Sequence, residues 1–189
     1  MLTFDPNDHT YRWNDVRVPS VTQVLHETHL SPNYSGWGAA QHRGNAVHLA
    51  CEYLDLHDLD WETLAPEWHG YVHGYELFLK ETGWTSELIE YQGYHPLFRY
   101  AGTLDRRGWF PERPQQRDLV DIKTGAPEAW HGLQLSGYQF EDSWKKDRRW
   151  GLYLKEDGKY QLKEYKDAAD RPIFLAAVTL CHYQRRHQR

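Results

Sequence analysis

The sequence predicts an α/β fold with a central mixed β-sheet flanked by helices. Two patterns predict it: apolar residues recur at helical spacing near both ends of the chain, and short runs with strand periodicity fill its middle. With 189 residues, of which 40% are hydrophobic, the chain is long enough to bury one sizeable core. We therefore expect a single domain over residues 1–189.

The first part of the chain is predicted to be a hairpin followed by a capped helix. Residues 11–13 and 16–18 alternate in polarity on either side of Asn14-Asp15, which is typical of a tight β-turn. Ser20 and Gln23 have the spacing of a capping box, so a helix should begin directly after Ser20. The proline and glycines of residues 31–38 then indicate a loop.

Two longer helices are predicted next. In residues 39–56 the apolar positions repeat at helical spacing, and this places His48 and Glu52 on one face, four residues apart. Residues 66–82 form the second helix, because Pro66 suits a first turn and Gly83 suits a C-terminal stop.

The remainder of the chain is predicted to begin with strands and end with a helix. Strands are expected over residues 87–94, 99–104, 107–110 and 119–123, with antiparallel neighbours. A helix should follow over about residues 128–143, and Asp157-Gly158 should join two strands at 152–154 and 160–162. Pro172 then opens a final apolar helix.

Charge and cysteine content limit the classes of protein. A formal charge of −5 excludes a uniformly basic surface, but local basic clusters still permit nucleic-acid binding. Two cysteines, Cys51 and Cys181, cannot form a four-cysteine metal cluster within this chain. The sequence has neither a membrane-spanning apolar run nor a signal peptide, so we expect no membrane partner and a cytoplasmic location in a bacterial or phage-infected cell.

Three short motifs between Gly102 and Tyr138 indicate chemistry. They are Gly102-x-x-Asp105, Asp121-x-Lys123 and Gln134-x-x-x-Tyr138. Asp105 and Asp121 each end an apolar run, where a central strand would hold the carboxylate rigidly. Two fixed carboxylates and a lysine favour metal-assisted phosphodiester chemistry.

The Asp121-x-Lys123 motif is weak evidence by itself. An acidic residue two positions before a lysine also occurs at Asp157-x-Lys159 and at Glu164-x-Lys166. The first copy differs in its context, because it ends an apolar run and stands between the other two motifs. The ordered set therefore carries the prediction.

This ordered set resembles the PD-(D/E)xK nuclease superfamily, in particular its RecB-like branch, which includes phage exonucleases and the mitochondrial genome maintenance exonuclease. Two further segments are similar to that branch: Arg43-Gly44-Asn45-Ala46-Val47-His48 and Pro19-Ser20-Val21-Thr22. The similarity spans about residues 18–138. The proline of the superfamily name is absent, as is usual in this branch, and the iron–sulfur variants are excluded by the cysteine count.

The resemblance implies a restriction-endonuclease-like core over about residues 40–145 and a set of site residues. Mg²⁺, which Mn²⁺ can replace, would be bound by His48, Asp105, Asp121 and the backbone carbonyl of Ile122. Lys123 would orient the attacking water or stabilise charge on the phosphorus, and Gln134 and Tyr138 would position water, lysine or DNA. Other readings are a hydrogen-bonded helix histidine for His48 and structural strand ends for Asp105 and Asp121.

Two groups of residues are secondary candidates. Glu90 could add a metal ligand or contact one, Glu52 could contact one, and either could be a surface carboxylate. Basic residues near the motifs are candidates for contacts with DNA, with a solvated surface as the alternative: Arg43, Arg106, Arg107, Lys145 and Lys146.

The resemblance implies an exonuclease that acts at DNA ends in recombination, repair or phage DNA processing. Its partner would be DNA that is single-stranded or has free ends, together with a recombination or single-strand-binding protein. A structure-selective endonuclease, a DNA-binding module that does not cleave, and a metalloenzyme for a small phosphorylated substrate are the alternatives.

Overall fold

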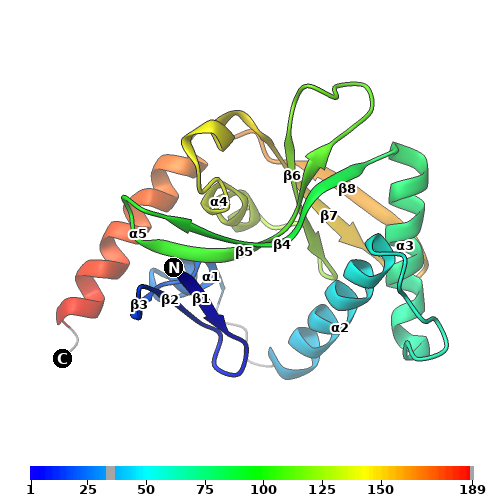
Figure 1. The fold of residues 1–189 in the computed structure, drawn as a ribbon, viewed down its shortest axis with the longest axis horizontal. Helices are drawn as coiled ribbons and strands as arrows, with labels where there is room; N and C mark the ends of the chain where they lie inside the picture. The colour runs from blue at the N-terminus through cyan, green and yellow to red at the C-terminus, as the bar shows by residue number, and fades with distance from the viewer. Residues whose placement is uncertain (33–36, 188–189) are drawn as a thin grey trace.

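The chain folds around a mixed five-stranded sheet flanked by helices, which confirms the predicted α/β class (Figure 1). The computed structural model describes residues 1–32 and 37–187. The strand order is β4-β5-β6-β7-β8, and in this sheet only β6 and β7 are parallel neighbours. The strands are β4 (Thr85–His95), β5 (Tyr100–Trp109), β6 (Asp118–Lys123), β7 (Arg148–Leu154) and β8 (Tyr160–Glu164).

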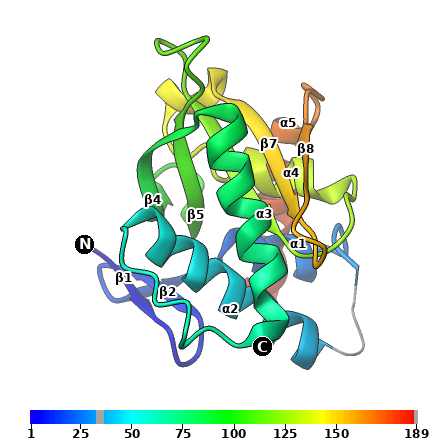
Figure 2. The same ribbon diagram turned by 90° about the vertical axis from the view of Figure 1, so that its right-hand side faces the viewer.

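Helices cover both faces of this sheet. On one face a hydrophobic cluster joins the sheet to α1 (Val21–Glu27), α4 (Trp130–Gly137) and α5 (Asp170–His187). On the other face a second cluster joins it to α2 (Trp37–Asp55) and α3 (Pro66–Thr82), which Figure 2 shows in front of the strands. Leu119, Val120 and Ile122 of β6 are fully buried, as expected for a central strand covered on both faces.

A small N-terminal sheet lies beside β4 and β5. It consists of β1 (Leu2–Asp5), β2 (Thr10–Trp13) and β3 (Val16–Val18), so the predicted hairpin around Asn14-Asp15 is confirmed. Trp13 stacks on Tyr94 of β4 with ring centroids 4.2 Å apart, and Ala101 N–H of β5 donates to Pro19 O at 3.0 Å. These contacts pack β1–β3 against β4 and β5 near Tyr94 and Ala101.

The predicted helix boundaries agree best with the structure where capping residues mark the end of a helix. Ser20 and Gln23 form the predicted capping box at the start of α1. The second long helix has the predicted bounds and ends at Gly83 in the left-handed conformation, with φ of 63°. The first long helix, predicted over residues 39–56, corresponds to α2. Of the loop predicted over residues 31–38, residues 33–36 lie outside the described parts of the chain.

Two predictions are wrong in detail. The strands predicted at residues 99–104 and 107–110 are one continuous strand, β5, because Asp105 and Arg106 are buried within it. The helix predicted over residues 128–143 ends at Gly137, and a short 3₁₀ helix, η1 (Asp142–Lys146), follows after a break. In that break Phe140 packs directly on Gly93, where an added Cβ would lie 2.0 Å from its ring.

The C-terminal elements follow the prediction closely. β7 and β8 form a hairpin around Asp157-Gly158, and α5 begins at Asp170 with Pro172 in its first turn. Cys51 and Cys181 are buried free thiols. Within the described ranges, we find no helix that combines the length and apolar character needed to cross a membrane.

Candidate metal centre

The candidate site lies where β5 and β6 separate. The two strands pair at only three positions, and the last of these is Arg106 with Val120. Beyond it, Ile122 N–H donates to Asp105 Oδ2 at 2.6 Å, so a side chain takes the hydrogen bond that continued strand pairing would supply. Asp105 is thereby held at the opening of the sheet.

His48 of α2 completes the contacts of the Ile122 backbone. Its Nε2 lies 2.9 Å from Ile122 O, and because a carbonyl can only accept, Nε2 carries the proton of this hydrogen bond. The other nitrogen, Nδ1, lies 3.5 Å from Asp105 Oδ1. A histidine held by a backbone carbonyl through one nitrogen, with the other facing a carboxylate, is typical of a metal ligand. In this arrangement Ile122 O orients His48.

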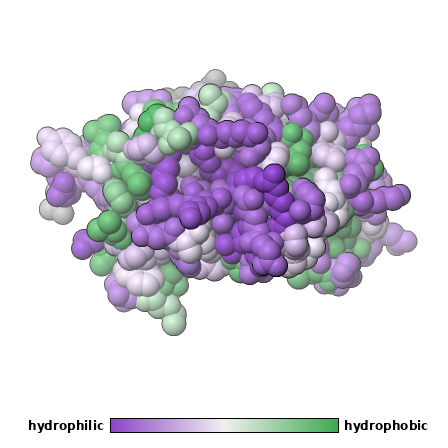
Figure 3. Space-filling view, turned by 90° about the horizontal axis from the view of Figure 1, so that it is seen from above, coloured by the Kyte–Doolittle hydropathy of each residue, from purple (hydrophilic) through white to green (hydrophobic). Residues whose placement is uncertain are grey.

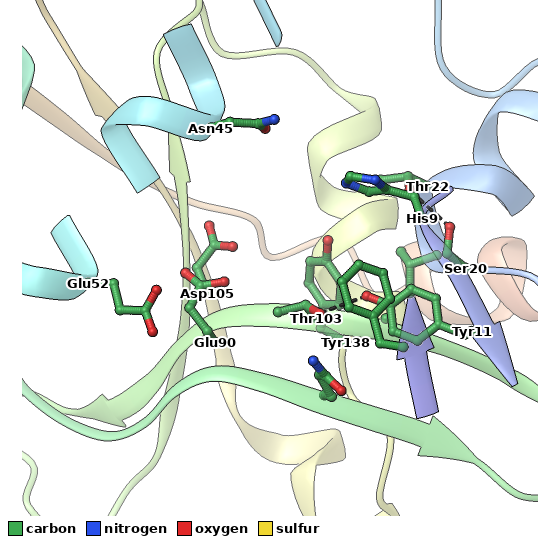
Figure 4. A pocket seen from close by; sticks show the side chains of 14 residues that line it. His9, Tyr11, Ser20, Thr22, Asn45, Glu52, Glu90, Thr103, Asp105 and Tyr138 are labelled. Carbon is green, nitrogen blue, oxygen red and sulfur yellow. Dashed lines mark hydrogen bonds between the residues drawn. The ribbon is translucent and has the colours of Figure 1, made fainter. Parts of the chain in front are cut away.

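Glu90 of β4 faces the same point. It stands opposite Asp105 between the pairs Ile89–Arg106 and Tyr91–Leu104, and its φ of 46° is uncommon for a residue other than glycine. Potential ligand atoms of His48, Glu90 and Asp105 all lie within 4.8 Å of one another. Figure 4 shows the carboxylates of Glu90 and Asp105 side by side, with Glu52 of α2 facing them.

Asp121 and Lys123 form an ion pair next to this group. Strand alternation turns both side chains toward α4, whereas Val120 and Ile122 pack on the α2–α3 side. Asp121 is 1% exposed, and its Oδ2 pairs with Lys123 Nζ. The close group therefore contains Glu90, which was a secondary candidate, and Asp121 lies outside it.

The acidic groups perturb one another. Burial, opposed by Lys123 and assisted by the Asp105 charge, raises the pKa of Asp121 to about 6. Burial and the Asp105 charge raise the pKa of Glu90 to about 7. Burial also disfavours the charge on Asp105, but His48, Lys123 and the Ile122 N–H outweigh it and lower the pKa of Asp105 to about 2. Crowded carboxylates of this kind suit a divalent cation.

Gln134 and Tyr138 approach from α4. Gln134 Nε2 donates to the Tyr138 hydroxyl oxygen at 3.0 Å, so the predicted four-residue spacing brings the two side chains together. Burial, together with the negative charges of Asp121 and Asp105, raises the pKa of Tyr138, and Tyr138 and Asp105 line the same cavity.

Among the cavities that adjoin the centre, two extend away from it. One has a volume of about 420 Å³ and extends from Asp105 and Glu90 past Tyr138 to the N-terminal sheet and α1 (Figure 4). The other has a volume of about 570 Å³, and Arg43 and Lys123 are among the residues that line it. A further cavity of about 290 Å³ lies against His48, Glu52 and Glu90.

The five candidate DNA contacts differ in position. Arg106 is fully buried, so its predicted contact with DNA is wrong. Arg107 is largely buried and pairs with Glu87 and Asp147. Arg43 Nε donates to Thr124 Oγ1 at 3.2 Å and lines the larger cavity.

Lys145 and Lys146 are exposed on η1. Figure 1 places η1 at the upper edge of the molecule, whereas β1–β3 and α2 lie at the lower edge. The face seen from above is covered largely by hydrophilic side chains (Figure 3).

The sequence reasoning missed the structural role of Arg106. Its Nε donates to Asp55 Oδ2 at 2.6 Å and its Nη1 donates to Glu90 Oε1 at 2.9 Å, while the Tyr75 hydroxyl also donates to Asp55. Arg106 thus ties the end of α2 to a member of the acidic group. The available signal was an arginine that directly follows Asp105.

The donor set fits a hard divalent cation. Carboxylate oxygens are the ligands that Mg²⁺ prefers, and an imidazole nitrogen also suits Mn²⁺. His48, Glu90 and Asp105 offer two carboxylates and one imidazole from three different elements of the fold. Because each is held by backbone or ion-pair contacts, the group is organised around one point.

The comparisons with known proteins concern the fold. No protein-family model matches the sequence, and no curated protein matches it significantly. The alkaline exonuclease LHK-Exo from Laribacter hongkongensis is similar in structure, with 15% identity over 89% of this chain and 92% of that chain and a TM-score of 0.43. Its complex with dAMP matches at 15% identity over 89% and 92%, with a TM-score of 0.38. SSO0001 matches at 16% identity over 84% and 81%, with a TM-score of 0.37.

Proposed function

We propose that the chain is a divalent-metal-dependent nuclease that hydrolyses phosphodiester bonds at DNA ends. The observation that carries this proposal is the opening between β5 and β6. It brings His48, Glu90 and Asp105 within 4.8 Å of one another and places the Asp121–Lys123 pair on the adjoining strand. The residues of this opening include the ordered motifs that resemble the PD-(D/E)xK superfamily.

The metal ligands we propose are Asp105, His48 through Nδ1, and Glu90, with Asp121 and Ile122 O joining when the ion is bound. A bound Mg²⁺ or Mn²⁺ supplies a Lewis acid for the phosphate and a water of lowered pKa. Ile122 N–H and Ile122 O hold Asp105 and His48 in place, so little reorganisation is needed for binding.

Lys123 and the α4 pair act on the substrate side. Asp121 holds Lys123 Nζ, which orients the attacking water or stabilises charge that develops on the phosphate oxygens. The Gln134–Tyr138 hydrogen bond fixes the phenol at the edge of the cavity of about 420 Å³, where it positions water or the DNA backbone.

Attack at DNA ends is tested with linear and closed circular single-stranded DNA in Mg²⁺ or Mn²⁺, with EDTA as the metal-free control. We expect mononucleotides from linear DNA and intact circles. Efficient cutting of circles would favour an endonuclease. Binding to both substrates without metal-dependent turnover would favour a module that does not cleave.

A further inference from the structure

The cavity of about 570 Å³ beside the candidate centre combines an aromatic wall with two cations. Trp130, the first residue of α4, lines it together with Arg43 of α2 and Lys123 of β6. Because Lys123 Nζ also pairs with Asp121, the cavity begins directly beside the proposed metal centre. Pockets that hold a small organic ligand measure about 300 to 1,000 Å³, so this cavity has room for one nucleotide unit.

Trp130 is half-buried, and its ring is fixed in place. It packs against the core cluster on the α4 side of the sheet, and its Nε1 donates to Glu128 Oε2 at 2.9 Å. The neighbouring His131 ring makes an edge contact with it, with centroids 4.2 Å apart. Because these contacts already restrain the indole, little further ordering is needed when a ligand packs on the part that lines the cavity.

Hydrogen bonds hold the two neighbours of Trp130 in turn. His131 Nδ1 lies 2.7 Å from the Tyr153 hydroxyl oxygen, and the Tyr165 hydroxyl donates to Glu128 O at 2.8 Å. Glu128 itself lines the cavity. A carboxylate repels a phosphate but accepts hydrogen bonds from the amino groups of bases. The wall formed by Trp130 and Glu128 therefore suits a base.

Arg43 supplies a cation for a phosphate. Its Nε donates to Thr124 Oγ1 at 3.2 Å, and its guanidinium lies 5.8 Å from the centroid of the Tyr71 ring. These contacts hold the side chain at the cavity wall, and a guanidinium group binds phosphate oxygens well. An aromatic ring that stacks on a base, next to a cation that binds the backbone, is typical of proteins that bind single-stranded nucleic acid.

We propose that Trp130 stacks on an unpaired base of the DNA and that Arg43 holds an adjoining phosphate, so the strand is single-stranded beside the bond that is cleaved. This assignment of the substrate class rests on the proposed nuclease function. Stacking on an aromatic side chain tolerates any sequence, because every base has a π-face. The cavity therefore selects unpaired DNA without selecting a sequence.

The first test measures binding of a short, fluorescein-labelled single-stranded oligonucleotide in EDTA, which removes the metal needed for cleavage. One abasic position is moved along the strand. For the wild type, we expect one such position to weaken binding about ten-fold, because the stacking base is missing. Trp130→Ala should bind the intact strand about ten-fold more weakly, and the abasic position should then have no further effect. An abasic profile in Trp130→Ala that matches the wild type would overturn the proposal.

Two further variants make this test specific. Trp109→Ala is the matched control, because Trp109 is also half-buried, contacts the guanidinium of Arg117 and does not line the cavity. Its affinity should stay within about two-fold of the wild type. Gly125 lines the cavity, and an added Cβ there meets no atom within 4 Å, so Gly125→Leu fills the space and leaves Trp130 unchanged. This variant should also bind about ten-fold more weakly, and wild-type affinity would contradict the proposal.

Blunt duplex DNA of the same sequence tests the requirement for an unpaired base. Trp130→Ala should change the affinity for the duplex less than about two-fold, because its bases stack on one another. An equal loss of affinity for duplex and single strand would refute the assignment. Release of nucleotides from the same oligonucleotide in Mg²⁺ tests the nuclease function separately. Absence of release with the abasic effect intact would overturn that function and support the role of Trp130.

Discussion

At the scale of single residues, Ile122 is the point that joins the candidate ligands. Its N–H holds Asp105 and its carbonyl holds His48, so a buried apolar residue fixes two polar ones through its backbone. Sequence patterns report side chains, which explains why Ile122 could be predicted only from the family resemblance. The same limit applies to Glu90, whose backbone conformation aims it at the centre.

The first prediction concerns His48. His48→Ala removes the proposed imidazole ligand and should raise the Mg²⁺ concentration needed for half-maximal cleavage by at least about ten-fold. A metal titration of the cleavage rate measures this. His42→Ala is the control on the same helix, because His42 is exposed and lies outside the group, and its titration should match the wild type. Matching titrations for both variants would remove His48 from the metal centre.

The second prediction concerns Arg106. Arg106→Met removes the cation that pairs with both Asp55 and Glu90. Because two carboxylates then lose their partner, the free energy of unfolding should fall by about 3–5 kcal/mol. Denaturant unfolding measures the change. Arg113→Ala, at an exposed arginine, should stay within about 0.5 kcal/mol of the wild type. A loss below about 1 kcal/mol in Arg106→Met would show that the buried ion pairs contribute little.

At the scale of elements, the caps and turns could be predicted because their chemistry is local. The capping box at Ser20, the Gly83 stop of α3 and the Asp157-Gly158 hairpin all follow from neighbouring residues. The continuity of β5 could not be predicted, because Asp105 and Arg106 interrupt the apolar pattern and are buried by partners distant in sequence.

The end of α4 depended on distant contacts in the same way. Its local pattern suits a longer helix, but Phe140 turns away to fill the space above Gly93 on β4. Part of the candidate site was also predictable, since the motifs placed Gln134 beside Tyr138 and Asp121 beside Lys123. The position of Glu90 required the pairing of β4 with β5.

The third prediction compares glycines in two elements. Gly44 lies within α2, and an added Cβ would meet no atom within 4 Å. Gly44→Ala should therefore raise the free energy of unfolding by about 0.5–1 kcal/mol through helix propensity. Gly108 of β5 differs, because its Cβ would lie 1.9 Å from Thr85 O, and Gly108→Ala should cost about 1–3 kcal/mol. Denaturant unfolding of both variants measures the two changes in the free energy of unfolding. A Gly44→Ala variant less stable than the wild type would contradict the claim that an added Cβ at Gly44 meets no neighbouring atom.

At the scale of the whole molecule, the site depends on parts that are far apart in sequence. His48 comes from a helix on one face of the sheet, Glu90 and Asp105 come from adjacent strands, and Gln134 and Tyr138 come from the other face. A ligand bound at their meeting point should stabilise the fold as a whole, because the native state binds it and the unfolded chain does not.

The fourth prediction is that Mg²⁺ or Mn²⁺ stabilises the protein against heat. At a metal concentration about 100 times Kd, binding to the folded state alone raises the free energy of unfolding by about 2.7 kcal/mol. A thermal melt detects this increase as a higher Tm. Asp105→Asn should abolish the metal-dependent part of the shift. Asp157→Asn, in the exposed hairpin copy of the motif, should retain it. Equal shifts in both variants would place metal binding elsewhere.

The most direct test of the account is the rate of nucleotide release from linear DNA in Mg²⁺ by the wild type, Asp121→Asn, Lys123→Ala and Lys159→Ala. The account predicts a loss of about one-hundred-fold or more in the first two variants, with the fold and DNA binding retained, because charge stabilisation at the phosphate is removed. Lys159→Ala should match the wild type, since Lys159 is an exposed residue of the hairpin. Turnover in Asp121→Asn or Lys123→Ala within about two-fold of the wild type would contradict the account.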